Sequence, residues 1–473
     1  MCHSKNPSDS QSRRMPISDA ILISWLQENF KDTGFIGRLE FDSYGRNKQL
    51  SDDIGNLKGD QPLHKQKPLI LPIWRNLVEN AIVFLKSKDD RETFHDDEAY
   101  GVEKLYKFFE AFRDFEGLLY GAEERYRDHM SHMFSVFLLG EYLIRERITF
   151  EKIDVGDKDL PDNQNNQKIS ADEKEAMWCI MSLTHDLGYA LQTIPSISGK
   201  ARDMLEEFGI INIQDLSYGF PRQPLHDFMI QFISSNLQRL PTPKTRTELF
   251  APHIQSKYFL KFSEAFEKRD HGVVSCLVLM KNLVYFLETD FLLDPHKPFN
   301  LLDARQFLIR RNILRPIASH SCEDIYYHTL HEFGSLLSIF DEMQEWDRPR
   351  LADLFMARIP ETRLIVEHLS DTEIHYKVEL RHEDSLGDDE RKYAKQDARR
   401  YFVKKCNRIR RILRSAVAEI DQPRELKLTF EVSHTVGPDI KDYKIIHETP
   451  QNVRVFEDNQ EISWLQLLAE ARS

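Results

Sequence analysis

The chain has 473 residues, of which 41% are apolar and 30% charged. This is the balance of an ordinary globular protein that can bury a full-sized core. Its formal net charge of −13 argues against a nucleic-acid coat protein, because phosphate binding needs a basic face. The charge does not exclude a small anionic substrate, since bound metal ions can reverse the field inside a pocket.

The sequence carries no recognisable membrane or export signal. No apolar run approaches the roughly 18 uncharged residues of a membrane span. The segment MCHSKNPSDSQSRRMP lacks the apolar stretch of a secretory signal. The five cysteines are scattered without a CxxC pair, which is typical of a reducing compartment. We therefore expect a cytoplasmic protein that makes no contact with a membrane.

The first part of the chain combines predicted helices with a polar loop. A helix is predicted from Ile17 to about Lys31, with Ser18 as its N-cap. The polar stretch that follows, to about Lys67, is predicted as a loop. Periodic apolar patterns then predict three helices, at 70–87, 97–120 and 125–148.

The middle of the chain is also predicted to be helical. Residues 153–169 lack an apolar period and are expected to form a surface loop. Ser170 and Glu173 then match a capping box, and Gly188 is expected to end the helix that this box begins. Further helices are predicted at 224–238, 259–268, 270–290, 303–312 and 322–345, with a Pro-rich break at 241–248.

The pattern changes after about Pro349. Segments such as TRLIVEHL and EIHYKVEL alternate and carry β-branched residues, which predicts strands. Between the strand-like segments, an amphipathic helix is predicted at 388–420, with Tyr401 and Phe402 packing on the sheet rather than stacking on bases. We predict a mainly α fold with a smaller C-terminal α+β domain. The predicted domains are an N-terminal extension (1–94), a helical domain (95–350) and the α+β domain (351–473).

Histidine and aspartate side chains occur on several apolar helices. A single histidine is more often a surface or satisfied core residue than a ligand. A buried aspartate beside a histidine is costly unless something pairs with it, and a cation is the simplest partner. Elements of this kind contain, in chain order, His129 and His132, the pair His185-Asp186, His271, His320 and Asp341.

This order of residues resembles the HD superfamily of metal-dependent phosphohydrolases, in its six-ligand form found in HD-GYP and cyclic-nucleotide phosphodiesterase domains. The resemblance covers about 95–350 and implies an HD-type helical bundle. It implies that His132, His185, Asp186 and Asp341 are the core metal ligands, and that His271 and His320 complete a second site. Asp186 would bridge two divalent ions (Mn, Mg, Fe, Ni, Co or Zn). His129 is the alternative first ligand, and it would otherwise face the substrate.

The implied function is hydrolysis of a nucleotide or another phosphoester by a hydroxide that two metal ions activate. Four side chains beside the first and last ligands are candidates for binding phosphate or forming a salt-bridged rim: Arg127, Asp128, Glu345 and Arg348. Of these, Arg127 and Arg348 are expected to act with Asp186 and His129 in catalysis. Tyr189 follows His-Asp-Leu-Gly where HD-GYP proteins have lysine, which argues against cyclic di-GMP as the substrate.

Two other functions fit the same ligand pattern. Di-iron oxygenases of the HD superfamily use the same six ligands, so the ligands alone do not fix the reaction. A non-catalytic nucleotide sensor or scaffold could also retain the cage of side chains. The helix at 395–414 carries nine Lys or Arg residues, which form either a solvated face or a contact with nucleic acid, an acidic partner or a second subunit.

Overall fold

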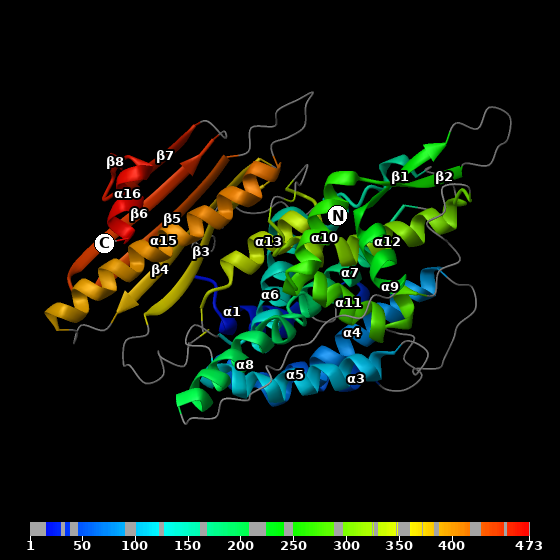
Figure 1. The fold of residues 1–473 in the computed structure, drawn as a ribbon, viewed down its shortest axis with the longest axis horizontal. Helices are drawn as coiled ribbons and strands as arrows, with labels where there is room; N and C mark the ends of the chain where they lie inside the picture. Colours follow the sequence, from blue (N-terminus) through cyan, green and yellow to red (C-terminus); the bar gives the residue numbers. More distant parts are fainter. Residues whose placement is uncertain are drawn as a thin grey trace.

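A computed structural model describes residues 16–29, 34–37, 46–89, 101–122, 127–160, 168–207, 224–240, 249–287, 297–323, 325, 330–346, 348, 360–370, 372–382, 387–416, 427–448 and 452–472. Within these ranges most residues are helical, and a six-stranded sheet lies near the C-terminus (Figure 1). The predicted fold class, mainly α with a smaller α+β part, is confirmed at this level.

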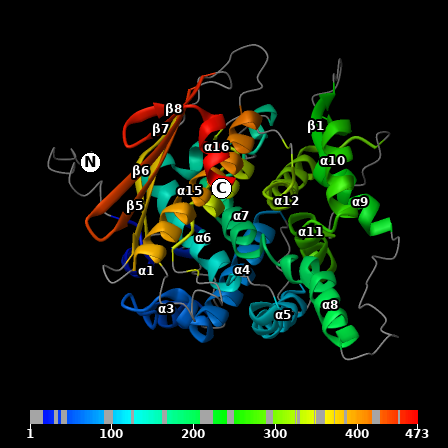
Figure 2. The same ribbon diagram turned by 60° about the vertical axis from the view of Figure 1, so that its left-hand side comes forward.

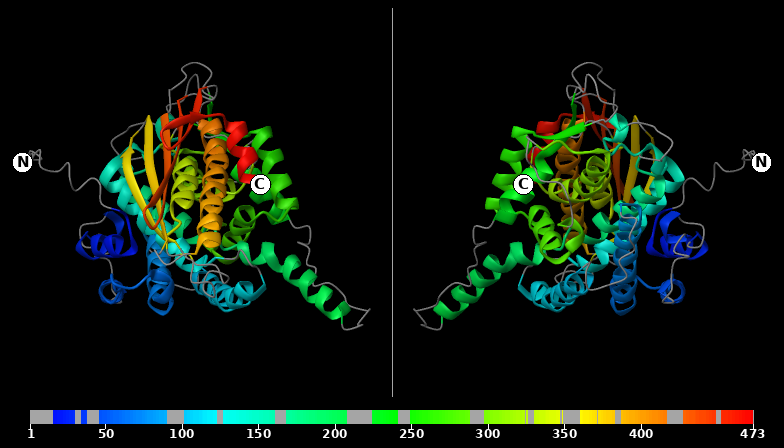
Figure 3. Two further views of the ribbon diagram at one scale, coloured as in Figure 1. Left: turned by 90° about the vertical axis from the view of Figure 1, so that its left-hand side faces the viewer. Right: turned by 90° about the vertical axis from the view of Figure 1, so that its right-hand side faces the viewer.

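The helical body consists of α1 (Asp19–Asn29), α2 (Gly34–Gly37), α3 (Arg46–Gly55), α4 (Lys67–Asp89), α5 (Val102–Ala122), α6 (Met130–Leu143), α7 (Ala171–Thr184), α8 (Tyr189–Glu207), α9 (Pro224–Ser234), α10 (Ser256–Glu267), α11 (His271–Asn282), α12 (Leu301–Ser319) and α13 (Phe333–Met343). At its centre α7 packs against α4, α6 and α12, and α12 also packs against α11 and α13. A hairpin of β1 (Ser235–Leu240) and β2 (Leu249–Ile254) is added to this body, and α8 projects from it (Figure 3).

The C-terminal part contains β3 (Glu361–Leu369), β4 (Glu373–His382), α15 (Asp388–Ala416), β5 (Lys427–Val436), β6 (Asp439–His447), β7 (Val453–Glu457), β8 (Gln460–Ile462) and α16 (Trp464–Arg472). The strands follow one another in chain order, and every neighbouring pair is antiparallel except β4 and β5. A parallel pair needs a crossover connection, which α15 provides. The predicted strands are confirmed, and the helix predicted at 388–420 is confirmed from Asp388 to Ala416, while 417–420 lie outside the described residues. The elements β7, β8 and α16 had not been predicted.

The long helix α15 lies between the sheet and the helical body (Figure 2). Its Phe402 stacks between Phe430 and Tyr443 of the sheet, with ring centroids 5.6 Å and 5.5 Å away, as predicted. The helix α15 also packs against α13 and α16. A single cluster of buried apolar side chains extends from Ile17 to Leu467, so the core crosses both predicted domain boundaries.

The helix α4 has the length and apolar character of a membrane span over 67–88, and 61% of an 18-residue apolar window within it is buried inside the protein. Trp74 on this helix stacks on Phe109, at a centroid distance of 4.0 Å. Its indole N–H donates to the carbonyl of Leu183 on α7. These contacts are those of a core helix.

Several predicted loops and helix ends are wrong. The polar stretch before Lys67 contains the helix α3, because Leu50 and Ile54, four residues apart, are both buried. The predicted surface loop at 153–169 buries Ile153, Val155, Leu160 and Ile169 where the structure describes it.

The helix predicted at 224–238 ends at Ser234 instead, because the residues after it pair with β2. The helix predicted at 303–312 continues to Ser319 as α12. The helix predicted at 322–345 begins only at Phe333 in the described residues. The Pro-rich break predicted at 241–248 lies outside them.

Candidate metal centre

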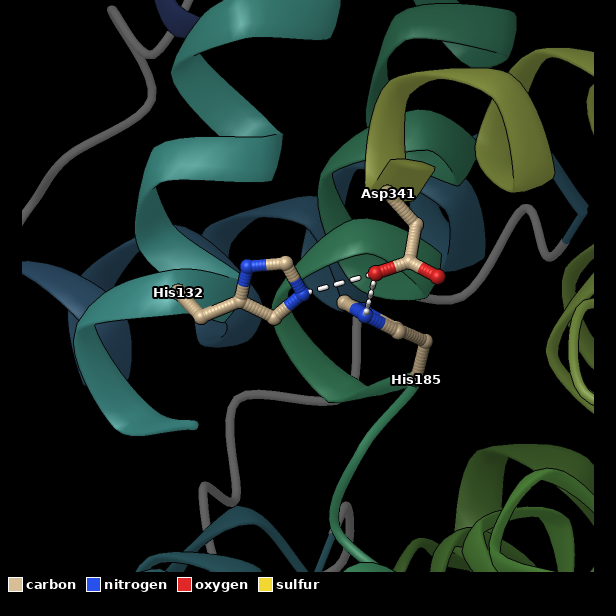
Figure 4. A group of neighbouring side chains, drawn as sticks. All are labelled: His132, His185 and Asp341. Carbon is tan, nitrogen blue, oxygen red and sulfur yellow. Dashed lines mark hydrogen bonds and ion pairs between the residues drawn. The ribbon is translucent and has the colours of Figure 1, made fainter. Parts of the chain in front are cut away.

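Five elements bring together the six side chains that the sequence predicts as metal ligands. His132 lies in the first turn of α6, His185 and Asp186 directly follow α7, His271 begins α11, His320 directly follows α12, and Asp341 lies near the end of α13. Helix termini and neighbouring turns therefore supply most of the site. Figure 4 shows three of these side chains, with His132 and His185 both pointing at the Asp341 carboxylate.

One half of the centre lies between α6, α7 and α13. The Oδ1 atom of Asp341 is 2.8 Å from Nε2 of His132 and 3.9 Å from Nε2 of His185. The Oδ2 atom of Asp186 is 3.8 Å and 3.6 Å from the same two nitrogens. Ligand atoms that share an ion at about 2.1 Å lie about 3–3.5 Å apart. Two nitrogens and two oxygens thus surround one point at roughly this spacing.

The other half uses the second oxygen of the same carboxylate. The Oδ1 atom of Asp186 is 3.4 Å from Nε2 of His271 and 3.4 Å from Nε2 of His320. The two Nε2 atoms are 3.1 Å apart. Asp186 therefore presents one oxygen to each pair of imidazoles, which is the geometry of a bridging ligand.

Each of the four imidazoles is held in place by a hydrogen bond at Nδ1, the ring nitrogen that does not face the centre. The acceptors for Nδ1 are Gln344 Oε1 for His132 (2.6 Å), the Ser182 carbonyl for His185 (2.8 Å), Gln192 Oε1 for His271 (2.7 Å) and the Ile317 carbonyl for His320 (2.7 Å). Because an oxygen of this kind can only accept, Nδ1 carries the proton and Nε2 presents a lone pair to the centre. Metal-binding histidines are oriented in this way.

These tautomers provide a test of whether metal ions fit the site. With Nδ1 protonated, the Nε2 atoms of His271 and His320 face each other with lone pairs at 3.1 Å, an arrangement that a cation between them stabilises. Nε2 of His185 is buried and has no hydrogen-bond partner. The donor set of four neutral imidazoles and two carboxylates suits borderline divalent ions. The facing lone pairs, the unpartnered Nε2 of His185 and the donor set all fit a pair of such ions.

The pKa values of three of the imidazoles agree with this assignment, and that of His320 departs from it. Burial lowers the pKa of His185 to about 4, and it also lowers the pKa values of His132 and His271. These rings are therefore neutral at pH 7. Burial would raise the pKa of Asp186, but His185 and the hydrogen bond from His129 more than offset it, so that this carboxyl is ionised. For His320 the hydrogen bond and the charge of Asp186 outweigh burial and raise the pKa.

The His-Asp turn is fixed by contacts with α11. The predicted capping box of Ser170 and Glu173 is present and begins α7, but this helix ends at Thr184 rather than at Gly188. A Cβ on Gly188 would lie only 2.3 Å from the carbonyl of His271, so glycine is needed for close approach. The Ser275 hydroxyl accepts from the Gly188 N–H and donates to the His185 carbonyl. Ser275 had not been predicted as part of the site.

The two histidines near the start of α6 take different positions. His132 faces Asp341 and His185 through Nε2. His129 precedes the helix as its N-cap residue, and its Nδ1 is 2.9 Å from Oδ2 of Asp186. Its ring stacks on Tyr189 at a centroid distance of 3.8 Å. The geometry therefore places both at the centre, with His132 inside the ligand set and His129 beside the bridging carboxylate.

The charged residues at the rim are engaged with one another. Arg127 forms an ion pair with Glu345, and Arg348 donates from Nε to the carbonyl of Asp128. The Asp128 carboxylate is buried and pairs with Lys67. Lys67, from α4, is a rim cation that the sequence analysis missed, because nothing in its own neighbourhood distinguishes it.

Part of the positive charge of the basic helix at 395–414 is paired with acidic side chains inside the molecule. Among the side chains of this helix that the structure describes, at least four basic ones form ion pairs with acids of the sheet or of α13: Lys395, Arg399, Lys405 and Arg408. Lys405 is the most buried of these, with 4% of its side chain exposed, and it contacts both Glu342 and Glu345. Much of the charge of this helix thus has an internal partner.

Comparisons of the chain with models of known families, with curated proteins and with solved structures gave no significant match. The side chains and their geometry are therefore the basis for proposing a function.

Proposed function

We propose that the protein is a metal-dependent phosphohydrolase of the HD type, acting on a nucleotide or another phosphoester with two divalent ions. The observation that supports this most is the Asp186 carboxylate, which offers one oxygen to each of two imidazole pairs. All four rings turn Nε2 towards it. The buried cysteine thiols agree with the cytoplasmic location that we expect for this enzyme.

The ions and the side chains of the protein would have different roles in the reaction. When bound, two divalent ions lower the pKa of water and withdraw charge from a phosphoryl oxygen. The protein holds the donor atoms: His129 fixes Asp186 by a hydrogen bond, and Tyr189 fixes His129 by stacking. Arg127 and Arg348 are our candidates for binding the phosphate group, for which each would exchange its present contact at the rim.

Metal analysis combined with an activity screen tests this proposal. Protein purified with and without oxygen is assayed for bound metals and for hydrolysis of nucleotides, cyclic nucleotides and generic phosphoesters. We expect about two ions per chain and hydrolysis of at least one substrate class. Asp186→Asn should lose both the metals and the activity. Asp203→Asn, on the exposed side of α8, is the matched control and should keep both.

Other results would contradict the proposal in distinguishable ways. Bound iron with oxygen consumption and no hydrolysis would indicate an oxygenase. Absence of bound metal from the wild-type protein, with full cellular function of Asp186→Asn, would indicate a sensor or scaffold.

A further inference from the structure

A second concave site lies apart from the six metal-ligand candidates. It is a cavity of about 280 Å³ between one face of α12, the start of α13 and the β1–β2 hairpin. The residues of α12 that line it follow helical spacing, from Leu308 through Arg311 and Arg315 to Ser319. None of the six candidate ligands lines this cavity. Its volume suits a small molecule.

Two arginines four residues apart form the polar wall of this cavity. Arg311 is buried, with 6% exposed, and Arg315 is half-buried. The side-chain oxygen of Asn236 accepts from Nη1 of both guanidinium groups. The carbonyl of Ser235 also accepts from both, at 3.4 Å and 2.9 Å. Each of these acceptors is neutral, so the hydrogen bonds do not cancel the two positive charges.

No ion pair joins Arg311 or Arg315 to a carboxylate in the part of the chain that the structure describes. Nε of Arg311 is buried and has no hydrogen-bond partner. Burial, with a contribution from the charge of Arg315, lowers the pKa of Arg311 to about 9, and burial lowers the pKa of Arg315 to about 10. Both shifts indicate buried positive charge with too little compensation.

The acidic residues of the lining do not remove this excess. Asp154 accepts from the backbone N–H of Gly156 and forms an ion pair with Lys158. Glu332, at the N-cap position of α13, makes no capping hydrogen bond through its side chain, and its charge raises the pKa of both arginines without offsetting their burial. With Arg239 at the hairpin, the lining holds three arginines and two acids. The cavity therefore favours an anion over a cation.

We propose that this cavity binds a small phosphate-bearing anion between Arg311 and Arg315. Guanidinium groups match the oxygens of phosphate by their planar donor geometry, and Arg311 has a buried N–H directed to no acceptor. The ring of Tyr258 lies over Arg315 at 4.8 Å and holds it in place. The ligand would hold α12 and α13 in fixed positions. These helices position two of the candidate metal ligands, since His320 follows α12 and Asp341 lies on α13.

A single isosteric substitution tests this site. Asn236→Asp places a carboxylate where both arginines already donate, so that the protein supplies its own counter-anion. Gln238→Glu is the control, because Gln238 is an exposed residue of the same strand and the change adds the same charge. Neither residue belongs to the His and Asp centre.

Binding is measured by calorimetry and by the shift in Tm of the full chain, in the presence of a chelator so that metal ions do not contribute. The probes are inorganic phosphate, pyrophosphate and a nucleoside triphosphate, with chloride at equal ionic strength as the reference. Wild type and Gln238→Glu should bind at least one probe. Asn236→Asp should bind it at least about tenfold more weakly, with a Tm in the absence of anion that is equal or higher. Comparison of the probes distinguishes free phosphates from nucleotides as the source of the ligand.

The proposal is overturned if wild type binds none of the probes at millimolar concentration, or if Asn236→Asp binds as tightly as wild type. Should Asn236→Asp fail to fold, Arg311→Met takes its place, since an apolar side chain of similar length tolerates this burial. Binding by Arg311→Met equal to that of wild type overturns the proposal as well.

Discussion

Two glutamines orient the imidazoles that face Asp186 from opposite sides. Gln344 accepts from His132, and Gln192 accepts from His271. Such partners typically change metal affinity 10- to 100-fold when they are removed. If the two proposed ions bind, Gln344→Leu should weaken binding of the ion beside His132, and Gln192→Leu should weaken binding of the ion beside His271, each by about this factor. Chelator competition monitored for both ions measures the effect, and equal loss of both ions in each variant would contradict it.

The buried His434 on β5 predicts a pH dependence of stability. Burial lowers its pKa to about 4, whereas the unfolded chain has a pKa of about 6.5. Between these values the unfolded state binds a proton that the folded state does not. The free energy of unfolding should therefore fall as the pH falls from 6.5 to 4, with about 3 kcal/mol contributed by this residue.

His434→Gln removes this titration and should make the pH dependence of unfolding shallower. Urea unfolding at a series of pH values measures the slope. His253→Gln, at an exposed position of β2, serves as the control and should keep the wild-type slope. An unchanged slope in His434→Gln would show that His434 is not responsible.

Some residues of the centre could be predicted from the sequence and others could not. His185 and Asp186 could be predicted, because a charged or metal-binding pair at the end of an apolar helix is costly without a partner. Gln344 could not be predicted, because neutral polar residues are common near helix ends and its partner lies 212 residues away in the chain. Ser275 was missed for the same reason, since its contact with Gly188 spans 87 residues.

At the scale of elements, hydrophobic periodicity predicted the long helices and the alternating strands of the C-terminal sheet. It failed where tertiary contacts decide the local structure. Leu237 lies four residues after Ile233 and so continues the apolar spacing of α9, but hydrogen bonding to β2 makes residues 235–238 part of a strand. The helix α3 is short and polar, and it buries only a few apolar side chains, so its sequence resembles a loop.

The contact between α15 and α13 predicts a large loss of stability from one substitution. Lys405 donates to the Glu342 carboxylate and carbonyl, both at 2.8 Å, and also pairs with Glu345. Lys405→Met removes the buried cation that these two acids share and leaves Glu342 with Arg408 and Glu345 with Arg127, which should cost about 3 kcal/mol. Lys427→Met removes an exposed ion pair with Glu373 and should cost at most about 1 kcal/mol. Urea unfolding compares the two, and similar losses would contradict the expectation.

At the scale of the whole molecule, contacts join the beginning, the middle and the end of the chain. The Trp346 indole N–H donates to Asp19 at 2.8 Å, and the Ile17 N–H donates to the carbonyl of Leu364 in β3. Gln344, which orients His132, also donates to the carbonyl of Trp346. The boundary predicted after residue 350 came from a change in local pattern, and the boundary after residue 94 came from the extent of the family resemblance. Neither contains information about such distant contacts.

This continuity predicts cooperative unfolding. Because the buried contacts cross the predicted boundaries, tryptophan fluorescence and far-UV circular dichroism should report one coincident transition in urea. Bound metal, if present, should be released in the same transition. Two separate transitions would indicate that the helical body and the C-terminal sheet unfold independently.

The position of α15 between the sheet and α13 makes the protein a candidate for fragment complementation. A cut between 348 and 360 would leave two pieces with matched surfaces, one presenting the acids Glu342 and Glu345 and the other the cation Lys405. Reassembly of the pieces would bring Lys405 back beside the helix that carries Asp341. If each piece were fused to one of two proteins that bind each other, their binding would bring the pieces together. The His and Asp centre would then be restored.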